Sequence, residues 1–332
     1  MASHCDARDL RVGVFGLFHP QHLVITSLPS QPVMVSVRAH EIVLSDSRRV
    51  NLDLEGGEIR LRAGDESFAS SEVRATDRIG RSADFLLTVP GKITRRFRGK
   101  LEVTCGTGEL VAVVEMDLEA AVAAAVAAES LPGTVLEALK AQAIATRSYY
   151  LASPLRHEGF DFCDTTHCQF LRESPASDSP AAQATAATRG LVLLYEGAIV
   201  PALFTGSCGG RTRTLAEVGF RPGRYPYFSV SCSACLKHAV HWSVRLDAGK
   251  AAELASHTEE NRLKVGRIFG WAAVPGNNFD LQADGDAVVI EGSGKGHGLG
   301  LCQLGAAGMA RQRDGFREIL AHYYPNTSLG TR

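Results

Sequence analysis

The stretch that decides the fold reads LEAAVAAAVAAESLPGTVLEALKAQAIATRSYY and runs from Leu118 to Tyr150. Its first part, residues 118–128, is dominated by alanine, which is the strongest helix former. The Pro-Gly pair at 132–133 interrupts that pattern, and apolar residues then return at helical spacing. The sequence therefore predicts two helices that meet at a tight corner, with Glu129 at the corner.

Short apolar runs separated by Gly, Pro, Asp and Ser fill the first 115 residues, as in a series of β-strands. A final helix is expected from about Leu304 to Tyr324. The fold class is therefore α+β: mixed, mostly antiparallel β-structure, a central helical pair and a C-terminal helix. The strands expected in the first part of the chain are Leu10–Phe15, His22–Ile25, Val33–Val37, Glu41–Leu44, Ile59–Leu61, Phe85–Val89, Lys100–Val103 and Leu110–Val114.

Composition excludes several classes of protein. The 332 residues include 35 basic and 36 acidic side chains, and this balance argues against a nucleic-acid binder. With 45% hydrophobic and 21% charged residues the chain is globular and not disordered. We expect no transmembrane segment, because no apolar run is long enough to cross a bilayer. No secretory signal is visible at the start of the sequence.

Glu129 is the first candidate for catalysis. Its neighbours Val126, Ala127, Ala128 and Leu131 are apolar, and a carboxyl group in a dry pocket favours its neutral form. A glutamate of this kind can act as a general acid near neutral pH. The alternative is an ordinary glutamate at the solvent-exposed end of a helix.

The second candidate is a group of four metal-ligand side chains within twelve residues, with the pattern His-x5-Cys-x3-His-Cys. Imidazole and thiolate groups are the ligands that tetrahedral zinc prefers. A disulfide between Cys163 and Cys168 is the alternative. The four expected zinc ligands are His157, Cys163, His167 and Cys168.

Two further segments carry reactive or conformationally unusual residues. Cys232 and Cys235 form a C-x2-C pair that could bind metal together with Cys208, or form a disulfide with it. The glycine-rich loop Gly294–Ala306 contains His297 and Gln303 in otherwise small and apolar surroundings. His297 could contact a ligand or, alternatively, fix the turn by bonding to its own backbone.

These motifs resemble, in the same order, those of the SpoIID/LytB family (stage II sporulation protein D). The resemblance covers about residues 85–330, which we expect to form the catalytic domain after an N-terminal β-rich region, residues 1–84. Cys302 stands where many relatives have serine. The matching segments are Ala127–Pro132, Leu136–Tyr149, Ala187–Leu193, Ser207–Thr212, Gly294–Gly298, Gln303–Ala306 and Ile319–Pro325.

The resemblance implies a lytic transglycosylase that cleaves peptidoglycan between N-acetylmuramic acid and N-acetylglucosamine and leaves 1,6-anhydro ends. Glu129 occupies the position of the family's catalytic glutamate. Zinc occurs in some members in the loop after that helix, where it would be structural. The residues that we expect to bind the substrate are Arg147, Ser207, Gly209, Gly210, His297 and Gln303.

Peptidoglycan lies outside the membrane, so the resemblance implies an extracytoplasmic protein. The second hypothesis is a noncatalytic glycan-binding protein that enhances a cell-wall amidase, as the name of the LytB branch suggests. A zinc hydrolase is disfavoured because four protein ligands leave no position for water. A cysteine nucleophile is disfavoured because no cysteine has a motif-defined histidine partner.

Overall fold

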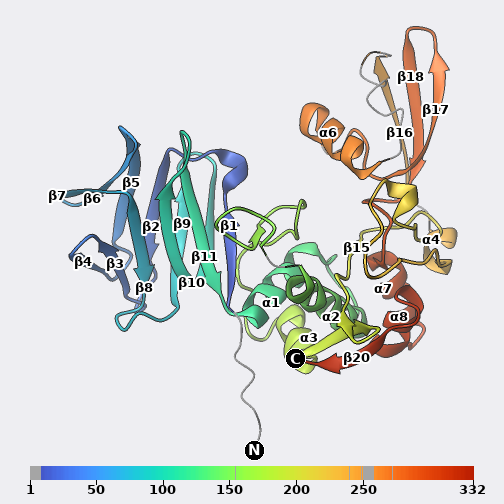
Figure 1. The fold of residues 1–332 in the computed structure, drawn as a ribbon, viewed down its shortest axis with the longest axis horizontal. Coiled ribbons are helices and arrows are strands. Elements are labelled where there is room, and N and C mark those ends of the chain that lie inside the picture. The colour runs from blue at the N-terminus through green and yellow to red at the C-terminus, as the bar shows by residue number, and fades with distance from the viewer. Residues whose placement is uncertain (1–8, 154, 239, 248, 250–257, 271) are drawn as a thin grey trace, which may run out of the picture. The chain divides into compact units, whose positions relative to one another are not determined.

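The computed structural model describes residues 9–332 except 154, 239, 248, 250–257 and 271. The chain divides into two compact units (Figure 1). The first unit contains Met1–Glu129 and Ser153–Ala182, and the second contains Ser130–Ala152 and Gln183–Arg332. The α+β fold class is confirmed by strands in both units and by helices that pack against them.

The first unit is built on a 12-stranded sheet in which nearly all neighbouring strands are antiparallel. Buried residues alternate with less buried ones along β2 and β9, because successive side chains point to opposite faces of a strand. Its strands are β1 (Leu10–Val14), β2 (His22–Ser27), β3 (Val33–Val37), β4 (His40–Leu44), β5 (Arg49–Glu55), β6 (Glu58–Ala63), β7 (Glu66–Ser70), β8 (Glu72–Thr76), β9 (Ala83–Val89), β10 (Ile93–Cys105), β11 (Leu110–Met116) and the short β12 (Phe162–Cys163); a 3-10 turn, η1, covers Gly16–Phe18.

Each expected strand of this part is present, but β5, β7 and β8 were not anticipated. β5 alternates buried Val50 and Leu52 with polar or charged residues, so its apolar positions never form a run. The expected domain boundary at residue 84 falls inside β9, which pairs with β2 and β10. The sheet continues without a break through β11, and the first compact unit contains Met1–Glu129 and Ser153–Ala182.

Helix α1 (Leu118–Glu129) also belongs to the first unit, and its residues Ala121 to Val126 are buried. Its small side chains allow the helix to pack closely. α2 (Leu136–Ala152) begins the second unit, so the expected helical pair is present, with Glu129 at the last position of α1.

In the second unit α2 packs against α7, α8, β13 and β14. β14, β13 and β20 form one sheet, β16, β18 and β17 form another, and β15 pairs in parallel with β19. Its elements are β13 (Leu191–Tyr195), β14 (Ala198–Ile199), β15 (Phe204–Thr205), η2 (Ala216–Val218), α4 (Ser233–Lys237), β16 (His241–Asp247), α6 (Glu259–Phe269), β17 (Asn278–Asp284), β18 (Ala287–Ser293), β19 (Leu301–Cys302), α7 (Gln303–Arg311), α8 (Phe316–Tyr323) and β20 (Ser328–Thr331); α3 (Pro180–Ala187) spans the division between the units.

The expected C-terminal helix is two helices, α7 and α8. Arg313 adopts a left-handed conformation with φ of 75°, which ends α7, and Gly315 caps the start of α8. Both helices pack against α2. Across the described residues, no helix combines the length and the apolar character that crossing a membrane requires.

Candidate functional site

The Glu129 carboxylate is held at the end of α1. Glu129 is half-buried, and its Oε1 accepts a hydrogen bond of 2.9 Å from the backbone N–H of Phe170. The helix ends here because Pro132 and Gly133 follow, the latter with φ of 76°. A backbone donor fixes the direction of the carboxyl group.

A small cavity of the second unit, about 90 Å³, is lined by Ser130, the residue that follows Glu129 in the chain. Gln142 and Gln303 line it as well. The Ser130 hydroxyl donates to Gln142 Oε1 over 3.1 Å. Gln142 Nε2 is buried and has no hydrogen-bond partner among the described residues, so it can donate to a ligand. Gln303, which the sequence analysis predicted to bind the substrate, lines this cavity.

Gln142 was missed by the sequence analysis. One feature of the sequence could have identified it. Gln142 is a polar residue on α2 between Leu139 and Ile144, which are buried where the helix faces the protein interior. A buried amide among apolar residues needs a partner, which makes it a candidate for binding.

Gly209 and Gly210 line a second and larger cavity of about 430 Å³, together with Arg211 and Arg213. Both glycines have positive φ, 70° and 119°, so the turn is closed to most other residues. Ser207, at the start of the same turn, is buried, and its Oγ lies 3.3 Å from Cys235 Sγ. Three of the predicted binding residues thus line cavities: Gln303 lines the smaller one, and Gly209 and Gly210 line the larger one.

His297 is half-buried, and its Nδ1 accepts a hydrogen bond of 3.0 Å from the backbone N–H of Leu299. Burial lowers the pKa of His297, and the Glu259 carboxylate opposes that shift. The imidazole therefore bonds to its own loop, as in the alternative given above. His297 belongs to the second unit and Glu129 to the first.

Arg147 has a structural position. Its side chain is fully buried and donates to the carbonyl oxygens of Leu191 and Thr185, over 3.0 and 3.4 Å. These bonds hold α2 against β13 and α3. A buried guanidinium that is bound to backbone carbonyls has no surface to offer a substrate, so we omit Arg147 from the proposed binding residues.

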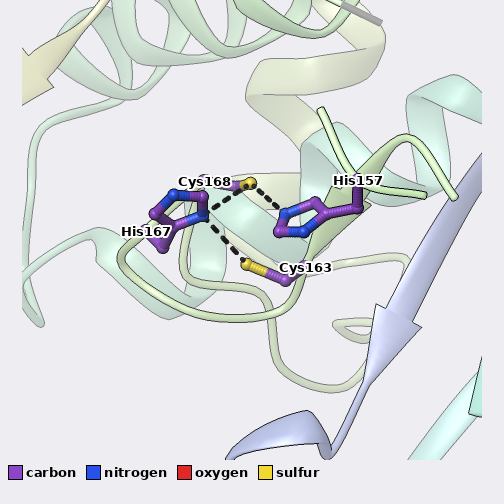
Figure 2. A group of neighbouring side chains, drawn as sticks. All are labelled: His157, Cys163, His167 and Cys168. Carbon is purple, nitrogen blue, oxygen red and sulfur yellow. Dashed lines mark hydrogen bonds between the residues drawn. The ribbon is translucent and has the colours of Figure 1, made fainter. Parts of the chain in front are cut away.

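The four residues expected to bind zinc come together in the first unit, and we call them the His157–Cys168 cluster (Figure 2). One ligand atom from each residue lies within 4.8 Å of the others. His157 Nε2 is 3.2 Å from Cys168 Sγ, and His167 Nδ1 is 3.7 Å from Cys163 Sγ and 3.6 Å from Cys168 Sγ. A tetrahedral zinc ion with two nitrogen and two sulfur ligands separates its ligand atoms by about 3.3–3.8 Å, so the donor set fits.

The loop that carries this cluster is anchored on β1. β12 pairs in parallel with β1, so that Gly13 lies beside Cys163. A Cβ at Gly13 would lie 2.6 Å from the ring of Phe160, so glycine is required for this close approach. Asp164 accepts from the Phe15 backbone N–H, and Arg95 forms an ion pair with it. Burial raises the pKa of Asp164 to about 6, although Arg95 opposes the shift.

Hydrogen bonding from the Cys168 thiol lowers the pKa of Cys163, with further contributions from Thr165 and His167. A thiolate is the form that binds a metal ion. The cluster can therefore hold a metal ion, and the loop between Cys168 and Phe170 connects it to the donor that binds Glu129.

A second group of four potential metal ligands consists of Cys208, Cys232, Cys235 and Cys302. The first three were candidates from the sequence. Cys302 was missed, because its distance of 67 residues from Cys235 gives no spacing signal.

The sequence matches one family model and is similar to known proteins. Residues 106–195 match the family model described as SpoIID, Stage II sporulation protein. An uncharacterised protein of Brachyspira hyodysenteriae is 29% identical over an alignment that covers 66% of this chain and 68% of the relative. An amidase enhancer of Bacillus subtilis is 23% identical, covering 58% of this chain and 38% of the enhancer. The chain thus spans well under half the length of that second relative.

Proposed function

We propose, from the SpoIID/LytB-family resemblance that the comparisons confirm, that this protein acts on the cell wall as a lytic transglycosylase. The substrate is the glycan strand of peptidoglycan, which places the protein outside the cytoplasm. The observation that carries the proposal is the Glu129 carboxyl group at the end of α1, bound by the backbone N–H of Phe170.

Glu129 acts first as a general acid. Its proton passes to the glycosidic oxygen while the bond from that oxygen to the muramic acid C1 breaks, and the sugar approaches an oxocarbenium ion. The glutamate is then a carboxylate, which the Phe170 N–H stabilises. It takes the proton of the muramic acid 6-hydroxyl as that oxygen bonds to C1 and closes the 1,6-anhydro ring. No water attacks, so a second carboxylate is not needed.

Several polar groups of the second unit can bind the glycan. Gln142 offers its buried Nε2, and Gln303 lines the same cavity. Gly209 and Gly210 allow a close approach of the backbone in the larger cavity beside Arg211. Amide donors and arginine suit the hydroxyl and carboxylate groups of peptidoglycan.

The His157–Cys168 cluster suits one structural zinc ion. A bound zinc would supply a crosslink and no chemistry in the cleavage, because four protein ligands complete its coordination. The four residues would fix the loop that ends at Phe170, and so they would position the donor for Glu129.

The test is Glu129→Gln, with Glu119→Gln on the same helix as the matched control. Purified glycan strands are incubated with each protein, and 1,6-anhydro ends are measured by mass spectrometry. Loss of a general acid typically costs about 10²–10⁴ in rate, and Glu129 serves as acid and base. We expect Glu129→Gln to lose at least that much with unchanged circular dichroism and Glu119→Gln to keep its rate. Equal rates for both variants would reject the assignment of Glu129.

A noncatalytic role is the second candidate, because one relative is named an amidase enhancer. The same assay distinguishes a lytic transglycosylase from a noncatalytic enhancer. An enhancer would yield no 1,6-anhydro ends alone, yet would raise the rate at which a cell-wall amidase releases stem peptides. That rate would then be unchanged in Glu129→Gln.

A further inference from the structure

Four cysteines of the second unit meet in its core, and we call them the four-cysteine cluster. Cys208 follows β15, Cys232 and Cys235 lie at the start of α4, and Cys302 lies between β19 and α7. All four Sγ atoms lie within 4.8 Å of one another. Each residue is at most 3% exposed, so the cluster is closed to solvent.

The sulfur positions fit a single tetrahedral ion. Zinc–sulfur bonds of about 2.3 Å separate neighbouring sulfurs by about 3.8 Å, and Cys235 Sγ lies 3.5 Å from Cys302 Sγ. A disulfide requires about 2.05 Å, and the seven cysteines that the structure describes are all free thiols. A four-iron cluster is too large, because its iron and sulfide atoms stand between the thiolates and separate them further.

Three of the four sulfurs each lie within hydrogen-bond distance of a backbone N–H or a hydroxyl group. The backbone N–H of Gly305 donates to Cys302 Sγ over 3.3 Å, and the Tyr323 hydroxyl donates to Cys232 Sγ over 3.4 Å. Ser207 Oγ lies 3.3 Å from Cys235 Sγ. Donors of this kind stabilise thiolates and orient metal ligands. Cys302 also caps the nine-residue helix α7, whose N-terminal end favours negative charge.

Packing around the cluster leaves no room for rearrangement. A Cβ at Gly305 would overlap the Tyr323 hydroxyl and would lie 2.6 Å from Cys232 Sγ. Leu299, Leu301 and Ala306 belong to the same buried core. Four ionised thiolates in such a place would repel one another unless a cation were bound. A cation at the centre of the sulfurs removes that repulsion.

We propose that the four-cysteine cluster binds one structural zinc ion, independently of the His157–Cys168 cluster. Each thiol releases its proton as its sulfur bonds to the ion, so no oxidant or reductant is involved. The ion joins β15, α4 and the start of α7 in the core of the second unit. Its four protein ligands leave no open position, so it takes no part in chemistry.

The test measures zinc, iron and copper per chain in whole protein purified without added metal. We expect zinc to persist at one ion per chain in a Cys163→Ser/Cys168→Ser variant, which lacks the other cluster. We expect Cys232→Ser/Cys235→Ser to lose one zinc relative to the unchanged protein. Cys105→Ser is the matched control, because that free cysteine lies on β10 outside both clusters, and it should lose none.

A second measurement uses the intact protein, in case a variant does not fold. X-ray absorption at the zinc edge should give an average of three sulfur ligands per zinc, because one cluster supplies four sulfurs and the other two. Absence of metal from the Cys163→Ser/Cys168→Ser variant in folded form would overturn the proposal. An average of two sulfurs, or peptide mapping that finds these four cysteines in disulfides, would also overturn it. None of these readouts depends on glycan cleavage.

Discussion

The two metal-ligand clusters of this protein differ in how the chain assembles them. The His157–Cys168 cluster is local: its ligands lie within twelve residues of one loop, and His167 is exposed. The four-cysteine cluster gathers residues from Cys208 to Cys302, 94 positions apart (302 minus 208), and buries all of them. One cluster holds a loop in place, whereas the other joins distant segments of a core.

This difference has an energetic consequence. A crosslink removes more conformational freedom from the unfolded chain when it closes a longer loop, although the effect grows only by about 0.6 kcal/mol for each doubling of the loop. The buried cluster adds a larger penalty when a ligand is lost, because unpaired thiolates would remain in a dry core. The comparison therefore predicts that the four-cysteine cluster controls stability and the His157–Cys168 cluster controls activity.

The largest expected effect is on stability. Cys235→Ala should lower the free energy of unfolding by more than about 4 kcal/mol, because it removes a buried ligand of the proposed zinc ion. Cys163→Ala should lower the free energy of unfolding by less, about 1–2 kcal/mol. Urea unfolding measures the difference: circular dichroism follows the whole protein, and the fluorescence of Trp242 on β16 follows the second unit. Equal losses in the two variants would contradict the comparison.

A smaller effect is expected on activity. Cys163→Ser should release the loop that ends at Phe170 and weaken the hydrogen bond from its N–H to Glu129. A hydrogen bond to a charged group contributes about 1.5–3 kcal/mol, so the rate of forming 1,6-anhydro ends should fall about 10- to 100-fold. Cys105→Ser serves as the control and should keep the rate. If Cys163→Ser cleaved glycan as fast as the unchanged protein, the loop would have no role in positioning Glu129.

The smallest effect is a pH dependence that belongs to the second unit. Burial lowers the pKa of His297 below its ordinary value of 6.5. The unfolded chain therefore takes up a proton that the folded protein does not, and stability falls as the pH drops below about 6.5, by at most about 1.4 kcal/mol per pH unit. Above about pH 6.5 the His297 imidazole is neutral in both the folded and the unfolded protein, so this contribution to stability does not change with pH.

The measurement is urea unfolding at pH 8.0 and pH 5.5, with tryptophan fluorescence, for the unchanged protein, His297→Asn and the matched His238→Asn at an exposed histidine. His297→Asn should lose less stability on acidification than the other two. An identical pH dependence of all three would show that His297 does not contribute to it.

Local features of the chain were predictable from the sequence. The alanine-rich run and the Pro-Gly corner predicted α1, α2 and the position of Glu129. The His-x5-Cys-x3-His-Cys spacing predicted the His157–Cys168 cluster, because a loop of twelve residues can bring its own side chains together whatever the rest of the fold does. The strands with uninterrupted apolar runs were predictable for the same reason.

Long-range packing was decided by the tertiary structure. In the sequence Cys302 was noted only as a residue that replaces the serine of many relatives. In the structure β19 pairs with β15, which places Cys302 beside Thr205, and its Sγ lies 3.5 Å from that of Cys235 on α4. The burial of Arg147 against β13 and the hydrogen bond of His297 to its own loop depend on elements that no local spacing reveals. Sequence alone determined which short segments form helices, strands and a ligand-rich loop, because those depend on neighbours within a few turns. The tertiary structure alone decided which side chains become buried partners, because burial arises only when segments far apart in the chain exclude water together.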